Sequence, residues 1–394
     1  MAWPNIVSGS YSTQEITAST DKRDVSDMLD LWAHKWTPVL NRISWGPESG
    51  GLLGFEWLEE HLGFGYVQTC AAIASNGTAF VLTTSGTGLA TTEVLKQVRA
   101  GTMLYAHVSG DTGGDVFLVI KTKATAGTCT ISQLTGTSTS EEIAASAKLY
   151  IVGRFANEGS DPFNDVSRKR SLLSNNFTIL RQDVKITGSQ AASDMYAVGD
   201  ETRHQIAMRL LELQFDRERT VLYSYPYART STQQGYMQGF FGFLDNYTSN
   251  AWVDNSTTSL KEADLNTLVS ECWDNGGSPN TFFAHKDIIR LFTQWDQTRV
   301  RTTTDAKLAG HHVVRYLTDI GIEIELVPMR KVPKNLAFLI DTGKCKLRAK
   351  KGRKLLLEKL GKTGDYTKYQ MISEFALEMR GYDLGYHGMF TELA

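Results

Sequence analysis

Residues 200–224 predict one long helix, and this segment limits the possible folds more than any other. Asp200 and Glu201 begin it, where a helix cap and the helix dipole favour acidic side chains. At ~1.5 Å per residue the helix would span roughly 35 Å. Its apolar side chains lie on more than one face, between charged ones: Ile206, Met208, Leu210, Leu211, Leu213, Phe215 and Leu222. Such a helix suits the backbone of an elongated molecule.

The character of the chain changes between about Val67 and Phe155. Short apolar runs there are divided by Gly, Ser and Thr, with turn signals such as Asn76-Gly77 between them. The runs are AFVLTT, TMLYAHV, VFLVIKT, TCTISQL and KLYIVG. Regularly spaced, strand-sized runs are typical of a β-barrel or sandwich. The sequence therefore predicts an inserted β-module.

Helices and strands are mixed in the rest of the chain. Ser26 resembles a helix cap before an apolar stripe that includes Trp32 and Trp36, and Pro38 should kink or end that helix. LKEADLNTLVSECWDNG and KDIIRLFTQW predict helices, whereas NFTILRQDVKIT, NTFFAH, GIEIELV and NLAFLI predict strands. QMISEFALEMRG alternates with period two, which also predicts a strand.

Composition excludes several classes of protein. The 394 residues carry 41 basic and 43 acidic side chains, so the chain is not a polycation built to coat nucleic acid. The four cysteines are scattered, with no C-x-x-C pair, and are expected to be reduced core residues. No apolar run approaches the ~18 residues of a membrane span. The polar N-terminus lacks a signal-peptide pattern, so we expect the product to stay in the cytosol where it is made.

Asp341 offers the strongest sign of catalysis. Asp341-Thr342-Gly343 follows the apolar strand AFLI, as in an aspartic protease loop. That chemistry needs two carboxylates sharing a proton, and the chain holds no second D-[ST]-G. A strand-ending turn on the surface is the simpler interpretation, and an aspartic-type hydrolase using Asp341 stays a weak alternative.

Other motifs fail on spacing. Gly361-Lys362-Thr363 lacks the glycine that a phosphate loop needs at position 356, and Gly86-Thr87-Gly88 lacks the third glycine of a dinucleotide site. His311 and His312 could bind a metal with Asp305, but no H-x-x-x-H spacing exists. No G-x-S-x-G occurs either. We therefore expect no catalytic, metal or cofactor site.

The order of segments is the most informative feature: FEWLEEHLG, FANEGSDPF, DMYAVGDETRHQIAMRLLELQFDRERTVLY, WDNGGSPNTFFAHK and LEKLGKTGDYTKYQMISEFALEMRG. This order resembles the Hong Kong 97-type capsid fold of tailed bacteriophages, in the subfamily with a β-domain inserted in the E-loop. The resemblance implies an α+β fold divided as follows: N-terminal arm 1–26, first peripheral part 27–51, E-loop 52–67 and 157–188, inserted β-barrel-like domain 68–156, spine helix and peripheral domain 189–232, axial domain 233–321, and peripheral β part with C-terminus 322–394.

The same resemblance implies a function. Many copies would form hexamers and pentamers of an icosahedral shell around double-stranded DNA. The implied partners are other copies, a portal, decoration or scaffolding proteins and non-specifically bound DNA, with no membrane. The place implied is the virion capsid, assembled in the host bacterial cytoplasm. An encapsulin-like compartment is the alternative of the same fold, and a β-rich tail or adhesion protein is disfavoured by the long helix.

Two sets of residues are candidate contacts with neighbouring subunits or the genome. One is a basic run with almost no acid before Glu358, and subunit contact is the preferred interpretation: Lys344, Lys346, Arg348, Lys350, Lys351, Arg353 and Lys354. The other is a set of aromatic anchors that lack enough local partners for a core: Trp3, Phe55, Trp57, Phe163 and Phe177. In a monomer these anchors should be exposed to water, so we expect them to be buried on neighbours.

Overall fold

The computed structural model describes residues 37–60, 65–69, 79–83, 98–107, 115–123, 128–135, 143, 147–159, 170–193, 200–230, 232–248, 250–257, 259–295, 300–302, 313–330 and 332–393. The described chain divides into two compact units. The first holds Arg181–Leu213 and Leu357–Met371, and the second holds the rest. Trp3, Phe163 and His311 lie outside the described residues, as does the stripe from Ser26 to Trp36.

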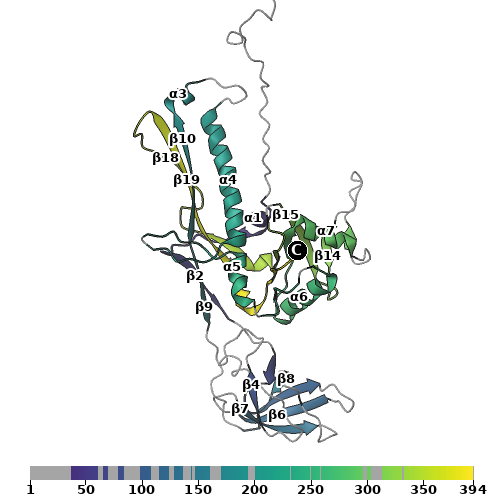
Figure 1. Cartoon of the computed structure of the whole chain (residues 1–394). Helices are drawn as coiled ribbons and strands as arrows, with labels where there is room; N and C mark the ends of the chain where they lie inside the picture. Colours follow the sequence, from purple (N-terminus) through teal and green to yellow (C-terminus); the bar gives the residue numbers. More distant parts are fainter. Residues whose placement is uncertain are drawn as a thin grey trace, which may run out of the picture. The chain divides into compact units, whose positions relative to one another are not determined.

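The predicted long helix is confirmed as α4 (Glu201–Tyr223) (Figure 1). Asp200 caps it, since its Oδ1 accepts hydrogen bonds from the backbone N–H groups of Thr202 and Arg203 at 2.9 and 3.2 Å. In the first unit, the short helix α3 (Gly188–Ala191) precedes α4 and is capped by Thr187. The Gly188 N–H there donates to the carbonyl of Asp365 at 3.2 Å.

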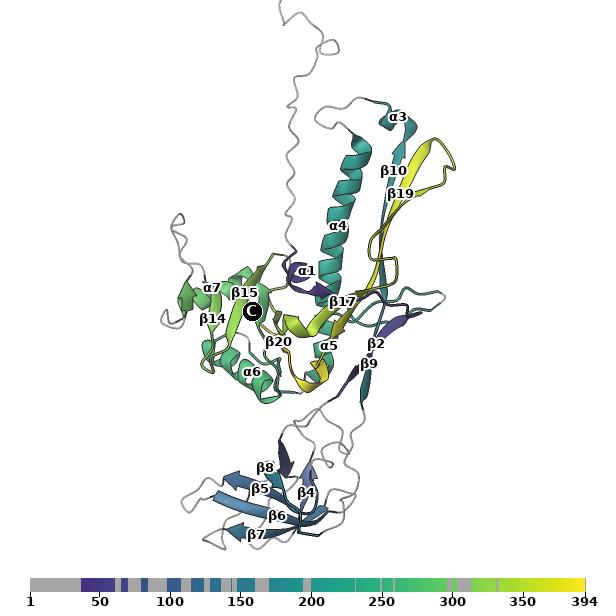
Figure 2. The same cartoon turned by 180° about the vertical axis from the view of Figure 1, so that it is seen from behind.

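A five-stranded sheet has the order β1-β17-β19-β10, with β18 paired to β19 outside that path (Figure 2). Its strands are β1 (Ser44–Trp45), β10 (Thr178–Thr187), β17 (Cys345–Ala349), β18 (Leu356–Leu360) and β19 (Tyr366–Met379). β19 confirms the predicted strand, and its residues 371–379 are all buried. Both faces of this strand are covered, and its polar side chains find partners described below.

A seven-stranded sheet lies in the second unit and has the order β11-β20-β16-β12-β15-β14-β13. Its strands are β11 (Val253–Asp254), β12 (Thr281–His285), β13 (Val300–Thr302), β14 (Val313–Leu317), β15 (Glu323–Met329), β16 (Ala337–Ile340) and β20 (Gly388–Phe390). β12 pairs with β15 in parallel and with β16 antiparallel. The expected boundary between residues 321 and 322 is therefore wrong, because it would cut this sheet.

The helices of the second unit are α1 (Pro38–Arg42), α5 (Phe240–Leu244), α6 (Glu262–Asp274) and α7 (Lys286–Gln294), with 3-10 turns η1 (Asp245–Tyr247), η3 (Thr342–Lys344) and η4 (Tyr382–Leu384). The predicted α6 ends as its glycines indicate: Gly276 has φ +91°, and the Gly277 N–H donates to the Cys272 carbonyl. Pro38 begins α1, because an N–H is not needed in the first turn of a helix. The helix that it was expected to kink or end falls mostly outside the described residues.

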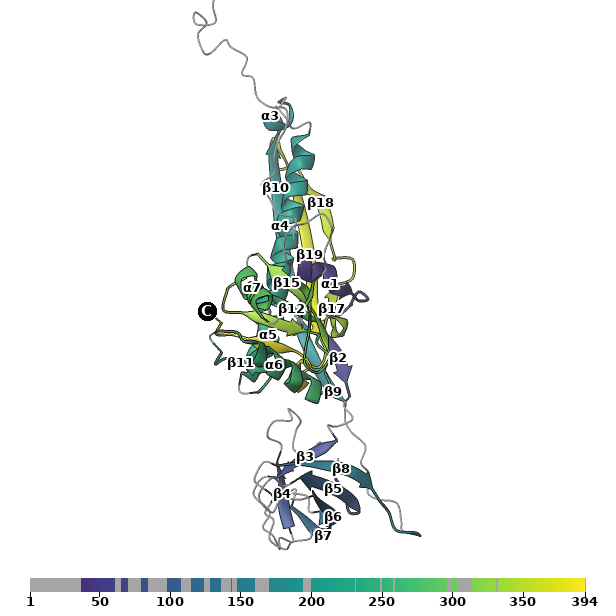
Figure 3. The same ribbon diagram turned by 90° about the vertical axis from the view of Figure 1, so that its right-hand side faces the viewer.

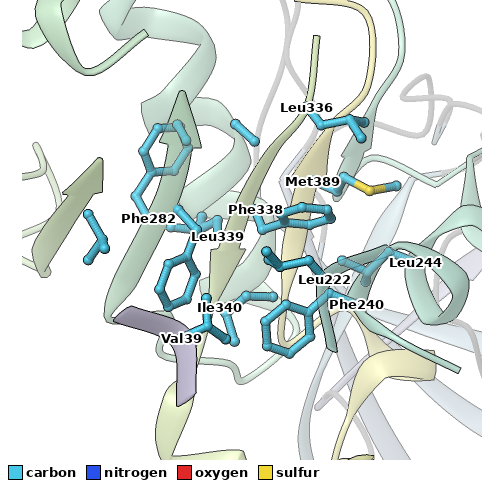
Figure 4. Close-up of a cluster of buried hydrophobic side chains, with 14 of the residues drawn as sticks. Val39, Leu222, Phe240, Leu244, Phe282, Leu336, Phe338, Leu339, Ile340 and Met389 are labelled. Carbon is cyan, nitrogen blue, oxygen red and sulfur yellow. The ribbon is translucent and has the colours of Figure 1, made fainter. Parts of the chain in front are cut away.

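One apolar core joins these elements. Figure 4 shows part of it, with side chains from α1, α4, α5 and both central strands of the seven-stranded sheet: Val39, Leu222, Phe240, Phe282, Phe338, Leu339 and Ile340. Cys272 and Cys345 are buried free thiols, as predicted. None of the described helices is long and apolar enough to cross a membrane.

The predicted β-rich segment forms a closed barrel in the order β3-β4-β7-β6-β5-β8 (Figures 1 and 3). Its strands are β3 (Tyr66–Thr69), β4 (Ala79–Thr83), β5 (Thr102–His107), β6 (Asp115–Lys123), β7 (Thr128–Thr135) and β8 (Lys148–Arg154). Every second side chain of its strands fills the barrel interior: Leu104 and Ala106 point inward on β5, and Leu118 and Ile120 on β6. The barrel has its own apolar cluster, which includes the free Cys129.

Candidate functional site

A two-stranded ribbon, β2 (Gly54–Glu59) paired with β9 (Ser171–Asn176), positions the predicted aromatic anchors (Figures 1 and 2). Trp57 is 4% exposed and packs edge-on to Phe243, while Phe177 is fully buried. Phe55 is half-buried and stacks on Trp57. The expectation that these three rings lack partners in their own chain is wrong. Strand alternation turns them toward the core formed by segments far away in sequence.

The ribbon is also held by polar contacts. Trp57 Nε1 donates to Glu59 Oε1 at 2.7 Å, and the Glu59 carboxylate accepts from the Gly381 N–H at 3.1 Å. Burial raises the pKa of Glu59 above its ordinary value. The Asn175 amide donates to the carbonyls of Gln238 and Leu377 and accepts from the Gln238 N–H. These contacts fix the inward face of the ribbon.

The outward face of the ribbon carries leucines that sequence reasoning missed. Leu58 lies directly opposite Leu172, and they are 53% and 62% exposed. Leu52 lies in a bend just before β2 and is 82% exposed. The period-two spacing from Trp57 could have identified this face: if Trp57 points inward, Leu58 points outward. A fixed ribbon with an exposed leucine pair is a candidate contact surface.

The predicted basic run largely serves the chain itself. Cations and small apolar residues alternate along β17, so one face is charged while Cys345, Leu347 and Ala349 are buried. Opposite them, β19 presents two buried carboxylates, Glu374 and Glu378. Much of this run is therefore not the free charged surface that contact with neighbouring subunits or DNA would use.

Glu374 lies among three cations. Its carboxylate is 3.3 Å from Lys350 Nζ, 2.7 Å from Arg353 Nε and 3.5 Å from Arg229 Nη1, and its side chain is only 2% exposed. A carboxylate so buried would be costly without such partners. Lys350 and Arg353 are thereby committed to their own chain.

Glu378 is held in the same way. Its fully buried carboxylate lies 2.5 Å from Arg348 Nε and 2.7 Å from Arg380 Nε. Arg348 also donates to the Pro47 carbonyl and lies 4.9 Å from the centre of the Phe55 ring. This side chain therefore joins β17, β19 and the ribbon.

The remaining lysines of the run differ. Lys354 Nζ lies 4.5 Å from the centre of the Trp45 ring. Lys344, Lys346 and Lys351 form no ion pair with any residue in the described part of the chain. Within the run, these three lysines are the charges left for a neighbouring subunit or DNA.

Glu218 is a buried acid on α4 that sequence reasoning missed. It is 6% exposed, and its Oε1 accepts weakly from the Val39 N–H at 3.5 Å. Burial raises the pKa of Glu218 to about 7, while the N–H groups of α1 and Arg42 oppose that rise. It could have been found from sequence, since it shares a helical stripe with Leu211, Phe215 and Leu222.

Asp341 closes a turn, as predicted, but not on the surface. It is 9% exposed, and its Oδ1 accepts from the Gly343 N–H at 3.0 Å as the cap of η3. Its own N–H donates to Nδ1 of the fully buried His387, whose Nε2 donates to the Arg380 carbonyl. Burial lowers the pKa of His387 to about 4. In the described chain no second carboxylate hydrogen-bonds to Asp341, so the geometry offers a structural role.

The described residues offer no metal site: no three of their His, Cys, Asp or Glu side chains are grouped so that they could hold an ion. The features that stand out are therefore a ribbon with one exposed leucine pair on its outer face, a set of buried ion pairs between β17 and β19, and a barrel with its own core.

Comparison with solved structures gives low sequence identity. The capsid of a native GTA particle aligns over 98% of this chain and 99% of its own, with 9% identity and a TM-score of 0.49. Mycobacterium phage Bobi aligns over the same fractions, with 9% identity and a TM-score of 0.46. The holo-SrpI encapsulin complex of Synechococcus elongatus aligns over 75% of this chain and 83% of its own, with 13% identity and a TM-score of 0.39.

No curated protein sequence matches the chain. A family model does: the one described as SU10 major capsid protein matches residues 9–394, nearly the whole sequence. A match of that extent covers both sheets, the long helix, the ribbon and the barrel together. The chain belongs to the SU10 major capsid protein family and is a bacteriophage structural protein that forms the capsid shell.

Proposed function

We propose that copies of this chain assemble into hexamers and pentamers that close an icosahedral shell around double-stranded DNA, with no enzymatic activity of their own. The observation that carries this proposal is the family match over residues 9–394. Portal, decoration and scaffolding proteins are the further partners that such a shell would need, and the host bacterial cytoplasm is the proposed place of assembly.

The parts of a Hong Kong 97-type subunit can be proposed on this structure. α4 corresponds to the spine helix, and the seven-stranded sheet with α6 and α7 to the axial domain. The ribbon β2–β9 corresponds to the E-loop, and the barrel between its strands to a domain inserted there. The returning E-loop stretch would end near Asn176, and not at residue 188, because β10 belongs to the five-stranded sheet. Residues 1–26 remain the proposed N-terminal arm.

The outer face of the ribbon supports assembly from many copies. Leu52, Leu58 and Leu172 leave apolar surface in water, at ~25 cal/mol for each Å². A second copy that covers this surface would recover that free energy. These leucines replace Phe55, Trp57 and Phe177 as the proposed contact residues of the ribbon, because those rings are occupied in their own chain. Trp3 and Phe163 stay proposed contacts.

Expression of the chain alone tests the proposal. Electron microscopy and sedimentation should find closed shells or capsomers, and deletion of residues 1–24 should leave a folded subunit that assembles poorly. Leu58→Ser with Leu172→Ser should also reduce assembly, while Leu357→Ser, at a leucine 51% exposed on β18, is the matched control. A wild-type chain that stays monomeric under all assembly conditions would refute the proposed function.

A further inference from the structure

Directly after α4 the chain makes a small hairpin that is held firmly in place. Tyr227 and Tyr236 form a bridge with both backbone hydrogen bonds, at 3.1 and 3.0 Å. The turn is closed by the Thr230 N–H, which donates to the Gln233 carbonyl at 3.2 Å. At the base, the Gly239 N–H donates to the Ser224 carbonyl at 2.8 Å. The backbone of this hairpin is therefore fixed by its own contacts.

Side chains also tie the hairpin to the rest of its unit. Arg229 reaches Glu374 at 3.5 Å and donates to the Phe177 carbonyl at 3.3 Å. Gln238 exchanges hydrogen bonds with Asn175 of β9, and Met237 is fully buried. One face of the hairpin is thus used for anchoring, so the other face is presented in a defined position.

The presented face consists of tyrosines. Tyr225, Tyr227 and Tyr236 are 52%, 49% and 48% exposed. Tyr227 and Tyr236 are directly opposite each other and their rings meet edge to face at 6.4 Å, so both lie on one side. Tyr225 stands two positions before Tyr227, the spacing that returns to the same side of an extended segment. Half of each ring remains uncovered, about 300 Å² in total.

The charge of this face restricts its occupant. The hairpin from Ser224 to Met237 contains one ionisable cation, Arg229, and that cation is committed to Glu374. Nucleic acid binding depends on cations that neutralise phosphates, which this face lacks. Uncharged, rigidly held tyrosines are instead typical of the centre of a protein contact, because their ordering costs little entropy on binding.

We propose that the face formed by Tyr225, Tyr227 and Tyr236 docks onto a second copy of this chain during shell assembly. This inference rests on the proposed function. The exposed area of about 300 Å² is less than the ~800 Å² per partner of a stable pairwise contact, so this face alone would not hold two free subunits together. The face can therefore form the centre of one contact among several, which leaves isolated subunits apart but strengthens a multivalent shell.

Tyr225→Lys is the sharpest test, because Tyr225 forms no hydrogen bond or ring contact within the described chain and its loss should leave the subunit folded. The concentration at which shells form, measured by light scattering and sedimentation, should rise at least tenfold. Tyr150→Ser is the control, since this barrel tyrosine is 50% exposed too. Unchanged assembly of Tyr225→Lys beside a normally assembling wild type would overturn the inference and leave the proposed function standing.

A photo-crosslinking residue at position 225 gives a second readout in assembled, DNA-filled particles. Irradiation should produce a band at twice the subunit mass, whose crosslinked peptide comes from another copy of the chain. Crosslinks to nucleic acid alone, or no crosslinks at all, would overturn the inference. A wild-type chain that forms no particles would instead refute the proposed function, and the two failures are therefore distinct.

Discussion

Glu218 and His387 should make opposite contributions to the pH dependence of stability. Burial raises the pKa of Glu218 from 4.5 to about 7. Its contribution to the free energy of unfolding is therefore fully present below pH 4.5 and is lost as the pH rises to 7. Burial lowers the pKa of His387 from 6.5 to about 4, so its contribution is present above pH 6.5 and is lost as the pH falls to 4.

The magnitudes are similar. Each pKa unit corresponds to about 1.4 kcal/mol, so each group should change the free energy of unfolding by about 3 kcal/mol across its window. The two changes oppose each other between about pH 4.5 and 6.5. In the wild type they should largely cancel, so the contribution of this pair to the pH profile should be nearly flat.

Single substitutions should reveal the two slopes. In Glu218→Gln, the free energy of unfolding relative to wild type should rise by about 3 kcal/mol between pH 4 and 7. In His387→Gln, the same difference should fall by a similar amount. The assay is urea unfolding of unassembled subunits from pH 4 to 8, followed by tryptophan fluorescence, with the exposed Glu358→Gln as control. Parallel profiles for wild type and both variants would refute this reasoning.

Three further outcomes follow from the contacts. Glu378→Gln should lower the free energy of unfolding by about 2–4 kcal/mol, because the largely buried Arg348 would lose its anion. A loss no larger than that of Glu358→Gln in the same urea assay would contradict this. Gly277→Ala should lower the free energy of unfolding by more than the ~0.5 kcal/mol of an ordinary surface substitution, since the new Cβ would lie 2.6 Å from Tyr386 Cα. Thermal melting measures this loss, and an unchanged midpoint would count against the close packing. Lys351→Glu should impair assembly of empty shells without changing subunit stability, whereas normal empty shells that fail only in DNA packaging would favour genome contact by this lysine.

The sequence is informative where a signal is local. Periodicity and capping residues predict α4, α6, the barrel strands and β16, because each depends on contacts between neighbours in the chain. The strand order of the seven-stranded sheet is not predictable in this way. β15 pairs with β12 in parallel although α7, β13 and β14 lie between them in sequence, and no local pattern specifies that pairing.

The candidate site was harder to predict for the same reason. Phe55 and Trp57 look unpartnered in sequence because their partners come from α5 and β17, far along the chain. The basic run looks like a free charged surface because Glu374 and Glu378 follow its last residue, Lys354, only after 20 and 24 positions. Its alternation with Cys345, Leu347 and Ala349 was nevertheless visible, and it indicates a strand with one covered face.

The ion pairs that Glu374 and Glu378 of β19 form with Lys350 and Arg348 also fix the register of β17 against β19 during folding. A slip of one residue would turn Glu374 and Glu378 to the apolar side of β17, away from Lys350, Arg353 and Arg348. An apolar sheet tolerates such a slip more easily, because one buried leucine can replace another. A misregistered subunit would be unstable and open to proteolysis, so defective copies would be removed before they could enter a growing lattice and distort its curvature.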